Sequence, residues 1–88
     1  MLAAPLSLLP AQYDAIAMNP PFHAGKATDV ALGRAFIAAS AAALAPGGTL
    51  LMVANRHLPY EAAIDAHFKS RQTIAETAAF KVIRATAR

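Results

Sequence analysis

Two short apolar runs on either side of one amphipathic stretch constrain the fold of this chain more than any other feature. The first run covers residues 13–18 and stops at a pair of prolines, and the second covers residues 49–54. Between them, bulky side chains recur at helical spacing until Pro46-Gly47-Gly48 ends the helix. The first run is typical of a buried strand, and the continuous second run is typical of a strand covered on both faces. The pattern therefore predicts strand, helix and strand, with the two strands parallel.

The helix between these strands is predicted over residues 29–44, and Thr28 or Asp29 supplies a capping oxygen at its start. Its bulky residues are expected to form one stripe that faces the sheet. The stripe comprises Leu32, Phe36, Ile37, Ala41 and Leu44.

The second half of the chain predicts a shorter helix and a pair of strands. Residues 58–68 mix apolar and polar side chains at helical spacing, whereas residues 73–77 and 80–85 are typical of strands. The link around Ala78-Ala79 is very short, so these strands should form an antiparallel hairpin. The expected order is βαβαββ in one α/β domain.

Composition excludes some classes of protein. The chain has no cysteine, which excludes a disulfide framework and a thiolate metal site and favours an intracellular protein. Residues 35–54 carry no charge over twenty positions, but Pro46-Gly47-Gly48 divides them, so a helix followed by a buried strand fits better than a membrane span. The net charge of +3 is dispersed and leans mildly toward anionic partners such as RNA, with an ordinary solvated surface as the open alternative.

The segment Asn19-Pro20-Pro21-Phe22 follows the first predicted strand, at the edge of the sheet where open α/β proteins bind ligands. A rigid proline turn with Phe22 in the core is the simpler interpretation and stays open. The residue types also suit the exocyclic amine of a nucleobase, because the Asn19 side chain and the Pro20 carbonyl can accept its two N–H groups. Such acceptors favour the pyramidal nitrogen that attacks a methyl group. Phe22 offers a flat face for base stacking.

At these residues the chain resembles class I S-adenosylmethionine-dependent methyltransferases. Asn19-Pro20-Pro21-Phe22 is similar to their (D/N/S)-P-P-(Y/F/W) motif. Further similarity to the guanine-N2 methyltransferases of small-subunit ribosomal RNA, the methyltransferase C type, extends over residues 19–25, 53–60 and 80–85. The resemblance implies the C-terminal half of a Rossmann-like sheet, with strands four to seven of the family fold in residues 13–88 and a leading segment in residues 1–12.

The resemblance also implies roles for particular residues. Asn19, Pro20, Pro21 and Phe22 would be catalytic, with Phe22 stacked on a flipped guanine of ribosomal RNA, and Asn19 and Pro20 would also border S-adenosyl-L-methionine. The family's cofactor pocket depends on a glycine-rich turn earlier in the domain. No glycine precedes Asn19, so we expect most of that pocket to be absent and this chain alone to be inactive.

Other residues have two possible roles or none at this site. His23 could contact the base or phosphate, or be exposed in a turn. Arg56 could bind phosphate or base through its planar fork, or form a surface ion pair. Tyr60 could line the substrate entrance, or start a helix, while Lys81 and Arg84 are expected on the surface. The histidines lack the spacing of a metal site, so no metal is expected.

Three further expectations concern partners, location and the acceptor. With a neighbouring strand absent, residues 13–18 would form an apolar sheet edge, which we expect a second copy or residues 1–11 to cover. The protein is expected in the cytoplasm. Adenine N6 or a protein glutamine stays open as the acceptor, as does a catalytically silent module that binds RNA or a partner.

Overall fold

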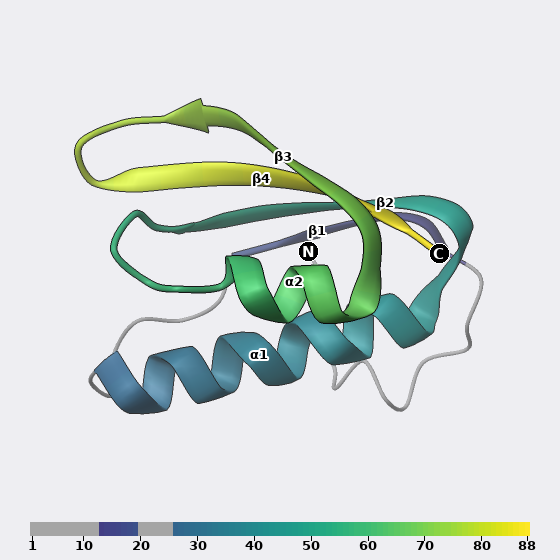
Figure 1. Ribbon diagram of the computed structural model, residues 1–88, viewed down its shortest axis with the longest axis horizontal. Coiled ribbons are helices and arrows are strands. Elements are labelled where there is room, and N and C mark those ends of the chain that lie inside the picture. The colour runs from purple at the N-terminus through teal and green to yellow at the C-terminus, as the bar shows by residue number, and fades with distance from the viewer. Residues whose placement is uncertain (1–12, 20–25) are drawn as a thin grey trace.

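The structure, a computed structural model, describes residues 13–19 and 26–88 of the chain. Its elements run in the order β1 (Tyr13–Met18), α1 (Lys26–Ala43), β2 (Leu44–Asn55), α2 (Glu61–His67), β3 (Phe68–Glu76) and β4 (Phe80–Ala87) (Figure 1). The predicted order βαβαββ and the α/β class are confirmed.

The strands form one mixed sheet in the order β1-β2-β4-β3. β1 and β2 are parallel, with Met18 beside Met52, whereas β2 with β4 and β3 with β4 are antiparallel. The predicted parallel pair and C-terminal hairpin are therefore both confirmed. Within the described residues β1 lies at one margin of the sheet, hydrogen-bonded only to β2.

Both helices pack on one face of this sheet (Figure 1). Alternate residues of the central strands point toward them, so Leu50, Met52 and Ile83 have no exposed surface. Burying side chains of this size stabilises the fold by roughly 1.5–3 kcal/mol each. The opposite face carries residues of the other parity, and Leu51 there is 38% exposed. The core thus lies between the sheet and the two helices.

Helix α1 starts earlier than predicted. It begins at Lys26, so Thr28 and Asp29 lie inside its first turns and the prediction that one of them caps the helix is wrong. An acidic residue in the first turn still stabilises a helix, because it faces the positive end of the helix dipole. The predicted end is nearly right, since α1 stops at Ala43.

The side of α1 that faces the core was only partly predicted. Leu32 is 38% exposed, whereas Ile37 is fully buried. The buried side also holds the small residues Gly33 and Ser40, and the Ser40 hydroxyl lies 3.8 Å from the Met18 sulfur. Small residues let the helix approach its neighbours closely, so a pattern built on bulky residues alone misses this face.

β2 is longer than the predicted strand because its irregular start pairs with β1. Tyr13 lies opposite Leu44, and the register then shifts before Ala15 pairs with Thr49. Gly47 lies in the extra stretch with φ +79°, a conformation that costs glycine little and other residues much more. The Pro-Gly-Gly segment therefore turns the chain from α1 into the sheet.

The second predicted helix and the strand after it have different bounds in the structure. α2 starts at Glu61 rather than at residue 58, because the preceding residues form a loop bonded to β4. β3 starts at Phe68, five residues before the predicted strand, and all its residues after Phe68 are exposed. A strand exposed on both faces shows no alternation of polar and apolar residues, so its start could not be recognised from the sequence.

Candidate functional site

The ends of β1 and β2 bring two segments to one edge of the sheet. Asn19 follows β1 directly and is exposed. Because Met18 pairs with Met52 in parallel, the loop of residues 55–60 leaves β2 at the same edge. The turn of residues 77–79 lies there too, since Phe80 pairs with Asn55. This edge, with Asn19 and the two loops, is the candidate site.

Backbone and side-chain hydrogen bonds shape the loop of residues 55–60. The Asn55 side-chain oxygen accepts the His57 N–H at 3.0 Å, a local turn that asparagine often makes. The Arg56 N–H donates to the Ala79 carbonyl at 2.9 Å, and the Leu58 N–H donates to the Asn55 carbonyl at 3.1 Å. The loop is thereby held against the turn before β4.

Arg56 takes part in a surface ion pair, the alternative that the sequence had left open. Its Nε lies 3.5 Å from a Glu76 carboxylate oxygen, and both side chains are about half exposed, at 47% and 49%. Exposed pairs of this kind contribute at most about 1 kcal/mol. Arg56 can therefore exchange Glu76 for a phosphate at little cost, and its role in binding RNA stays a prediction.

The Tyr60 side chain is buried, which favours the second of its two alternatives, the start of a helix, over a place at the substrate entrance. It has no exposed surface, and its hydroxyl donates to the Asp29 carbonyl of α1 at 2.8 Å. Burial and the nearby Asp29 charge raise the pKa of Tyr60, so the phenol remains a neutral donor. This structure offers no Tyr60 surface to a substrate, and the residue instead directly precedes α2.

Gly33 makes this position of Tyr60 possible. A Cβ added at Gly33 would overlap the end of the Tyr60 ring. No role for Gly33 was predicted from the sequence. Its position within the predicted helix was the available signal, because an interior helix glycine that costs about 1 kcal/mol usually has a packing reason.

Lys81 contradicts the expectation that it is a surface charge. The residue is 5% exposed, and its Nζ donates to the Leu58 carbonyl and to Glu61 Oε2, each at 2.7 Å. The signal was present in the sequence, because Lys81 shares the strand face of Ile83 and Ala85. A charged residue on the buried face of a strand needs partners, and here the loop and α2 supply them.

The charge of Glu61 is stabilised by this arrangement. Burial by itself raises the pKa of the Glu61 carboxyl, but the hydrogen bonds from Lys81 and the Glu61 backbone N–H, with the charges of Lys81 and Arg71, bring it below its ordinary value of 4.5. A lowered pKa means that the folded state favours the ionised form more than the unfolded state does.

Glu61→Gln is therefore expected to reduce the acid sensitivity of the fold. The stabilisation from ionised Glu61 is complete above pH 4.5 and is lost as the pH falls through the lowered pKa. Urea unfolding at pH 6 and pH 3 should show a smaller difference in unfolding free energy for the variant than for the parent chain. Equal differences would show that the Glu61 charge does not contribute.

Four of the predicted site residues lie outside the described ranges. These are Pro20, Pro21, Phe22 and His23. Of the motif, the structure places only Asn19, and the roles assigned to the others stay predictions.

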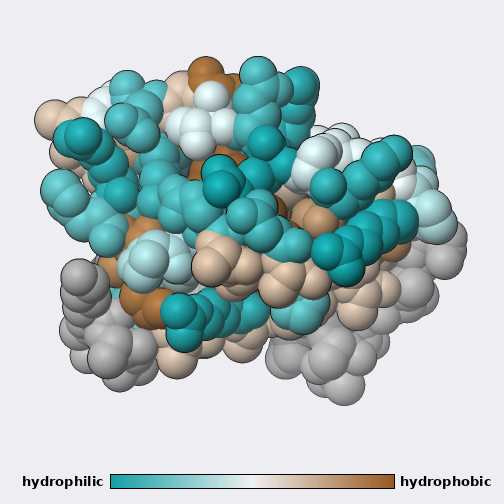
Figure 2. Space-filling model, in the orientation of Figure 1, coloured by the Kyte–Doolittle hydropathy of each residue, from teal (hydrophilic) through white to brown (hydrophobic). Residues whose placement is uncertain are grey.

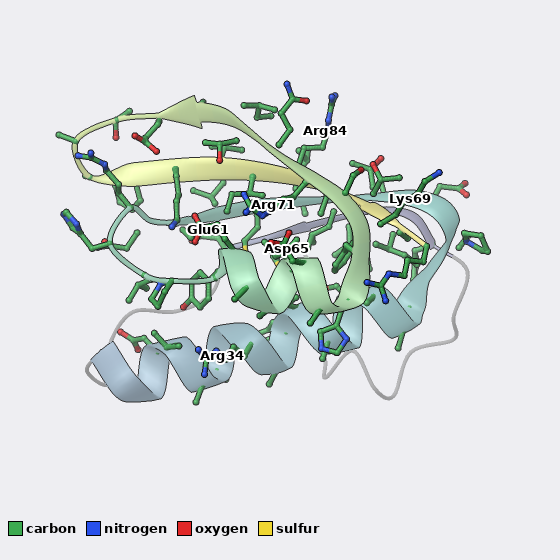
Figure 3. The ribbon with its side chains drawn as sticks, viewed as in Figure 1. Arg34, Glu61, Asp65, Lys69, Arg71 and Arg84 are labelled. Carbon is green, nitrogen blue, oxygen red and sulfur yellow. The ribbon has the colours of Figure 1, made fainter. Side chains whose placement is uncertain are left out.

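Positive charge is dispersed rather than gathered into one patch. Arg34, Lys69 and Arg84 lie well apart in Figure 3. The charge of Arg71 is paired, because two of its nitrogens donate to the Asp65 carboxylate at 2.7 and 3.2 Å. Arg84 donates to the Gln72 side chain at 2.9 Å. Polar side chains spread over the hairpin and α2 on the side seen in Figure 2, with apolar atoms between them.

Neither a metal centre nor a membrane helix is present in the part of the chain that the structure describes. Among residues 13–19 and 26–88, no three histidine, aspartate or glutamate side chains gather where they could hold a metal ion. No described helix has the length and hydropathy needed to cross a bilayer.

Comparison with known proteins assigns this fold to a family. Residues 5–84 match the methyltransferase small domain. The ribosomal RNA small subunit methyltransferase C of Alteromonas mediterranea is 46% identical over 71 residues, which are 81% of this chain and 20% of that protein. The enzyme of the same name from Pectobacterium atrosepticum is 43% identical over 75 residues, 85% of this chain and 22% of that protein. The chain thus spans about a fifth of the length of these relatives.

Solved structures agree with this match. The 16S rRNA N2 methyltransferase RsmC of Thermus thermophilus, solved in complex with AdoMet and guanosine, superimposes with a TM-score of 0.75 at 37% identity, over 89% of this chain and 21% of that protein. TrmN from Thermus thermophilus superimposes with a TM-score of 0.64 at 18% identity, over 100% of this chain and 28% of that protein, which shows a shared fold alone. The predicted Rossmann-like methyltransferase fragment is confirmed.

Proposed function

Since the chain belongs to the methyltransferase small domain family, we propose that it is the acceptor-binding part of an S-adenosylmethionine-dependent methyltransferase. The acceptor is the exocyclic N2 amine of a guanine in ribosomal RNA. One observation carries the proposal. Asn19 is exposed at the end of β1 beside the loop of residues 55–60, in a chain that shares 37% identity with an enzyme solved in complex with AdoMet and guanosine.

Asn19 supports methyl transfer by accepting a hydrogen bond from the guanine amine. This amine is a poor nucleophile because its lone pair is delocalised into the ring. The Asn19 side-chain oxygen and the Pro20 carbonyl accept its two N–H groups, which favours a pyramidal nitrogen with an available lone pair. Acceptors positioned before the reaction stabilise the transition state without reorganising during it. After the transfer the positively charged N-methyl amine releases one proton to water, so the reaction requires neither a metal nor a strong base from this chain.

The remaining contacts to RNA come from residues on either side of this acceptor. Phe22 stacks on the flipped base, which contributes roughly 1–3 kcal/mol. His23 and Arg56 contact the base or the backbone phosphates. Arg56 suits this role because it is 47% exposed at the same edge as Asn19. The net charge of +3 also favours an anionic partner. A role on ribosomal RNA would be carried out in the cytoplasm.

The chain supplies only a small part of the cofactor site. S-adenosylmethionine provides the methyl group, and Asn19 with Pro20 borders it on the acceptor side. Of the glycines in the described residues, Gly33 accommodates Tyr60 and Gly47 lies in the irregular start of β2. Because a glycine-rich turn is what brings backbone close to such a cofactor, we expect the described residues to border only the acceptor side of the pocket.

A chimera tests the proposal. In it, this chain replaces the matching segment of the Thermus thermophilus RsmC, and circular dichroism checks its folding. With S-adenosylmethionine tritiated in the methyl group, we expect label in 16S rRNA from the chimera and none from the 88-residue chain alone. Label in an adenine-only RNA or in protein glutamine would assign the acceptor differently. A folded chimera that labels nothing would indicate a catalytically silent module.

The exposed edge of β1 leads to a prediction about assembly. Within the described residues β1 pairs only with β2, and an unpaired edge invites another strand. If a second copy covers this edge, light scattering should show that the isolated chain is a dimer. If residues 1–11 cover it instead, the chain should be a monomer, and removing those residues should produce the dimer. A monomer in both forms would contradict the prediction.

A further inference from the structure

The loop of residues 55–60 is held by two side chains that the proposed chemistry does not use. Near its middle, the Leu58 carbonyl accepts a hydrogen bond from buried Lys81 of β4 at 2.7 Å. At its end, the Tyr60 hydroxyl donates to the Asp29 carbonyl in the first turn of α1 at 2.8 Å. One contact ties the loop to the sheet and the other ties it to the helix that follows the proline motif.

A second hydrogen bond fixes the direction of the Lys81 side chain. Its Nζ also donates to Glu61 Oε2 at 2.7 Å, and the Lys81 side chain is 6% exposed against 32% for Glu61. Figure 3 shows Glu61 on the side of α2 that faces the sheet. Because a buried ammonium group needs partners in a fixed geometry, Lys81 orients the loop and the start of α2 together.

These contacts act on a loop that carries a proposed RNA-binding residue. Arg56 lies two positions before Leu58, and its own N–H is bonded to the Ala79 carbonyl. The Arg56 side chain forms only a weak surface ion pair with Glu76. The position of its guanidinium therefore depends mainly on the loop backbone. If the backbone moves, the guanidinium moves with it.

We propose that Lys81 and Tyr60 are positioning residues, which hold the loop of residues 55–60 so that Arg56 faces the same RNA substrate as Asn19. This inference rests on the proposed function. Neither residue touches the substrate, and each acts through the loop backbone. A buried pair such as Lys81 with Glu61 is weak evidence for a contribution to stability, because an apolar side chain of similar size often serves equally well. Positioning explains why a cation lies on this strand face.

Lys81→Met separates positioning from stability. Methionine fills the space of the lysine stem, the Leu58 carbonyl keeps its bond from the Tyr60 N–H at 3.1 Å, and Glu61 reaches solvent. We therefore expect the variant to fold. Binding of a fluorescein-labelled, guanine-containing single-stranded RNA to the 88-residue chain is then measured by fluorescence anisotropy.

The expected result is a double-mutant cycle that is not additive. Arg56→Ala and Lys81→Met should each weaken binding about tenfold, the effect of losing one charged hydrogen bond. The double variant should be no weaker than Arg56→Ala alone, because Lys81 acts through Arg56. Tyr60→Phe should behave like Lys81→Met, with a smaller loss. Arg34→Ala, which removes a positive charge from α1 away from this loop, is the matched control and should bind within about twofold of the parent.

Each outcome decides between positioning and its alternatives. If losses from Lys81→Met and Arg56→Ala add, or if Lys81→Met binds like the parent chain, the positioning role is wrong while the proposed function stands. If the parent chain does not bind RNA, the proposed function is in question instead. Amide hydrogen exchange at Arg56 and His57 then tests positioning alone, with about tenfold faster exchange expected in Lys81→Met and unchanged exchange contradicting it.

Discussion

Asn19→Ala in the chimera is expected to reduce methyl transfer about 100- to 1,000-fold, the usual cost of removing one positioned hydrogen-bonding group from a transition state. The side chain is exposed at the end of β1 and does not belong to the core. Its loss should therefore leave the unfolding free energy nearly unchanged. The rate of label transfer to 16S rRNA under single-turnover conditions is the measurement.

A conservative variant controls for this result. Asn19→Asp keeps an oxygen acceptor at the same position and should retain more activity than Asn19→Ala. The resemblance supports this choice, since aspartate occurs at the first position of the family motif. Near-normal transfer by a folded Asn19→Ala variant would remove Asn19 from the mechanism.

Gly33→Ala is expected to destabilise the fold by about 2–3 kcal/mol, although alanine is normally the better helix former. The added methyl would overlap the Tyr60 ring, which has no exposed surface and is hydrogen-bonded to Asp29. Tyr60 must then leave its position or α1 must move away. Urea unfolding of the 88-residue chain measures the loss.

A second background tests whether the Tyr60 ring is the cause. In a Tyr60→Ala chain the obstructing ring is gone, so Gly33→Ala should now stabilise the helix by up to about 1 kcal/mol. The same substitution would thus change sign between two backgrounds. Destabilisation of equal size in both would show that Gly33 is required for another reason.

Patterns along the sequence predicted the elements that bury apolar side chains. β1 is apolar apart from Asp14, and residues 50–54 of β2 are all apolar. The Pro-Gly-Gly segment marked the end of α1 almost to the residue. β3 was placed late because its residues beyond Phe68 are exposed. A strand without a buried face shows no alternation of apolar and polar residues, so β3 is recognised only by its pairing with β4.

The candidate site was predictable where it depends on chain order and was missed where it depends on packing. Asn19 and Arg56 follow β1 and β2, so the sequence brought them to one edge. Lys81 was expected on the surface and Tyr60 either at a substrate entrance or at the start of a helix, yet both side chains are buried. The partner of Tyr60 is Asp29, 31 positions away in the chain. The partners of Lys81 are Leu58 and Glu61, 23 and 20 positions away. Contacts over such separations follow from tertiary structure.

The most direct test of the proposed function is the identity of the methylated nucleoside. The chimera is incubated with 16S rRNA and S-adenosylmethionine carrying a deuterated methyl group, and the RNA is digested to nucleosides for mass spectrometry. We predict deuterated N2-methylguanosine from the chimera and its near absence from the Asn19→Ala chimera. Deuterium on adenine N6 or another atom, or equal N2-methylguanosine from both proteins, would contradict the proposal that this chain presents a guanine amine for methylation.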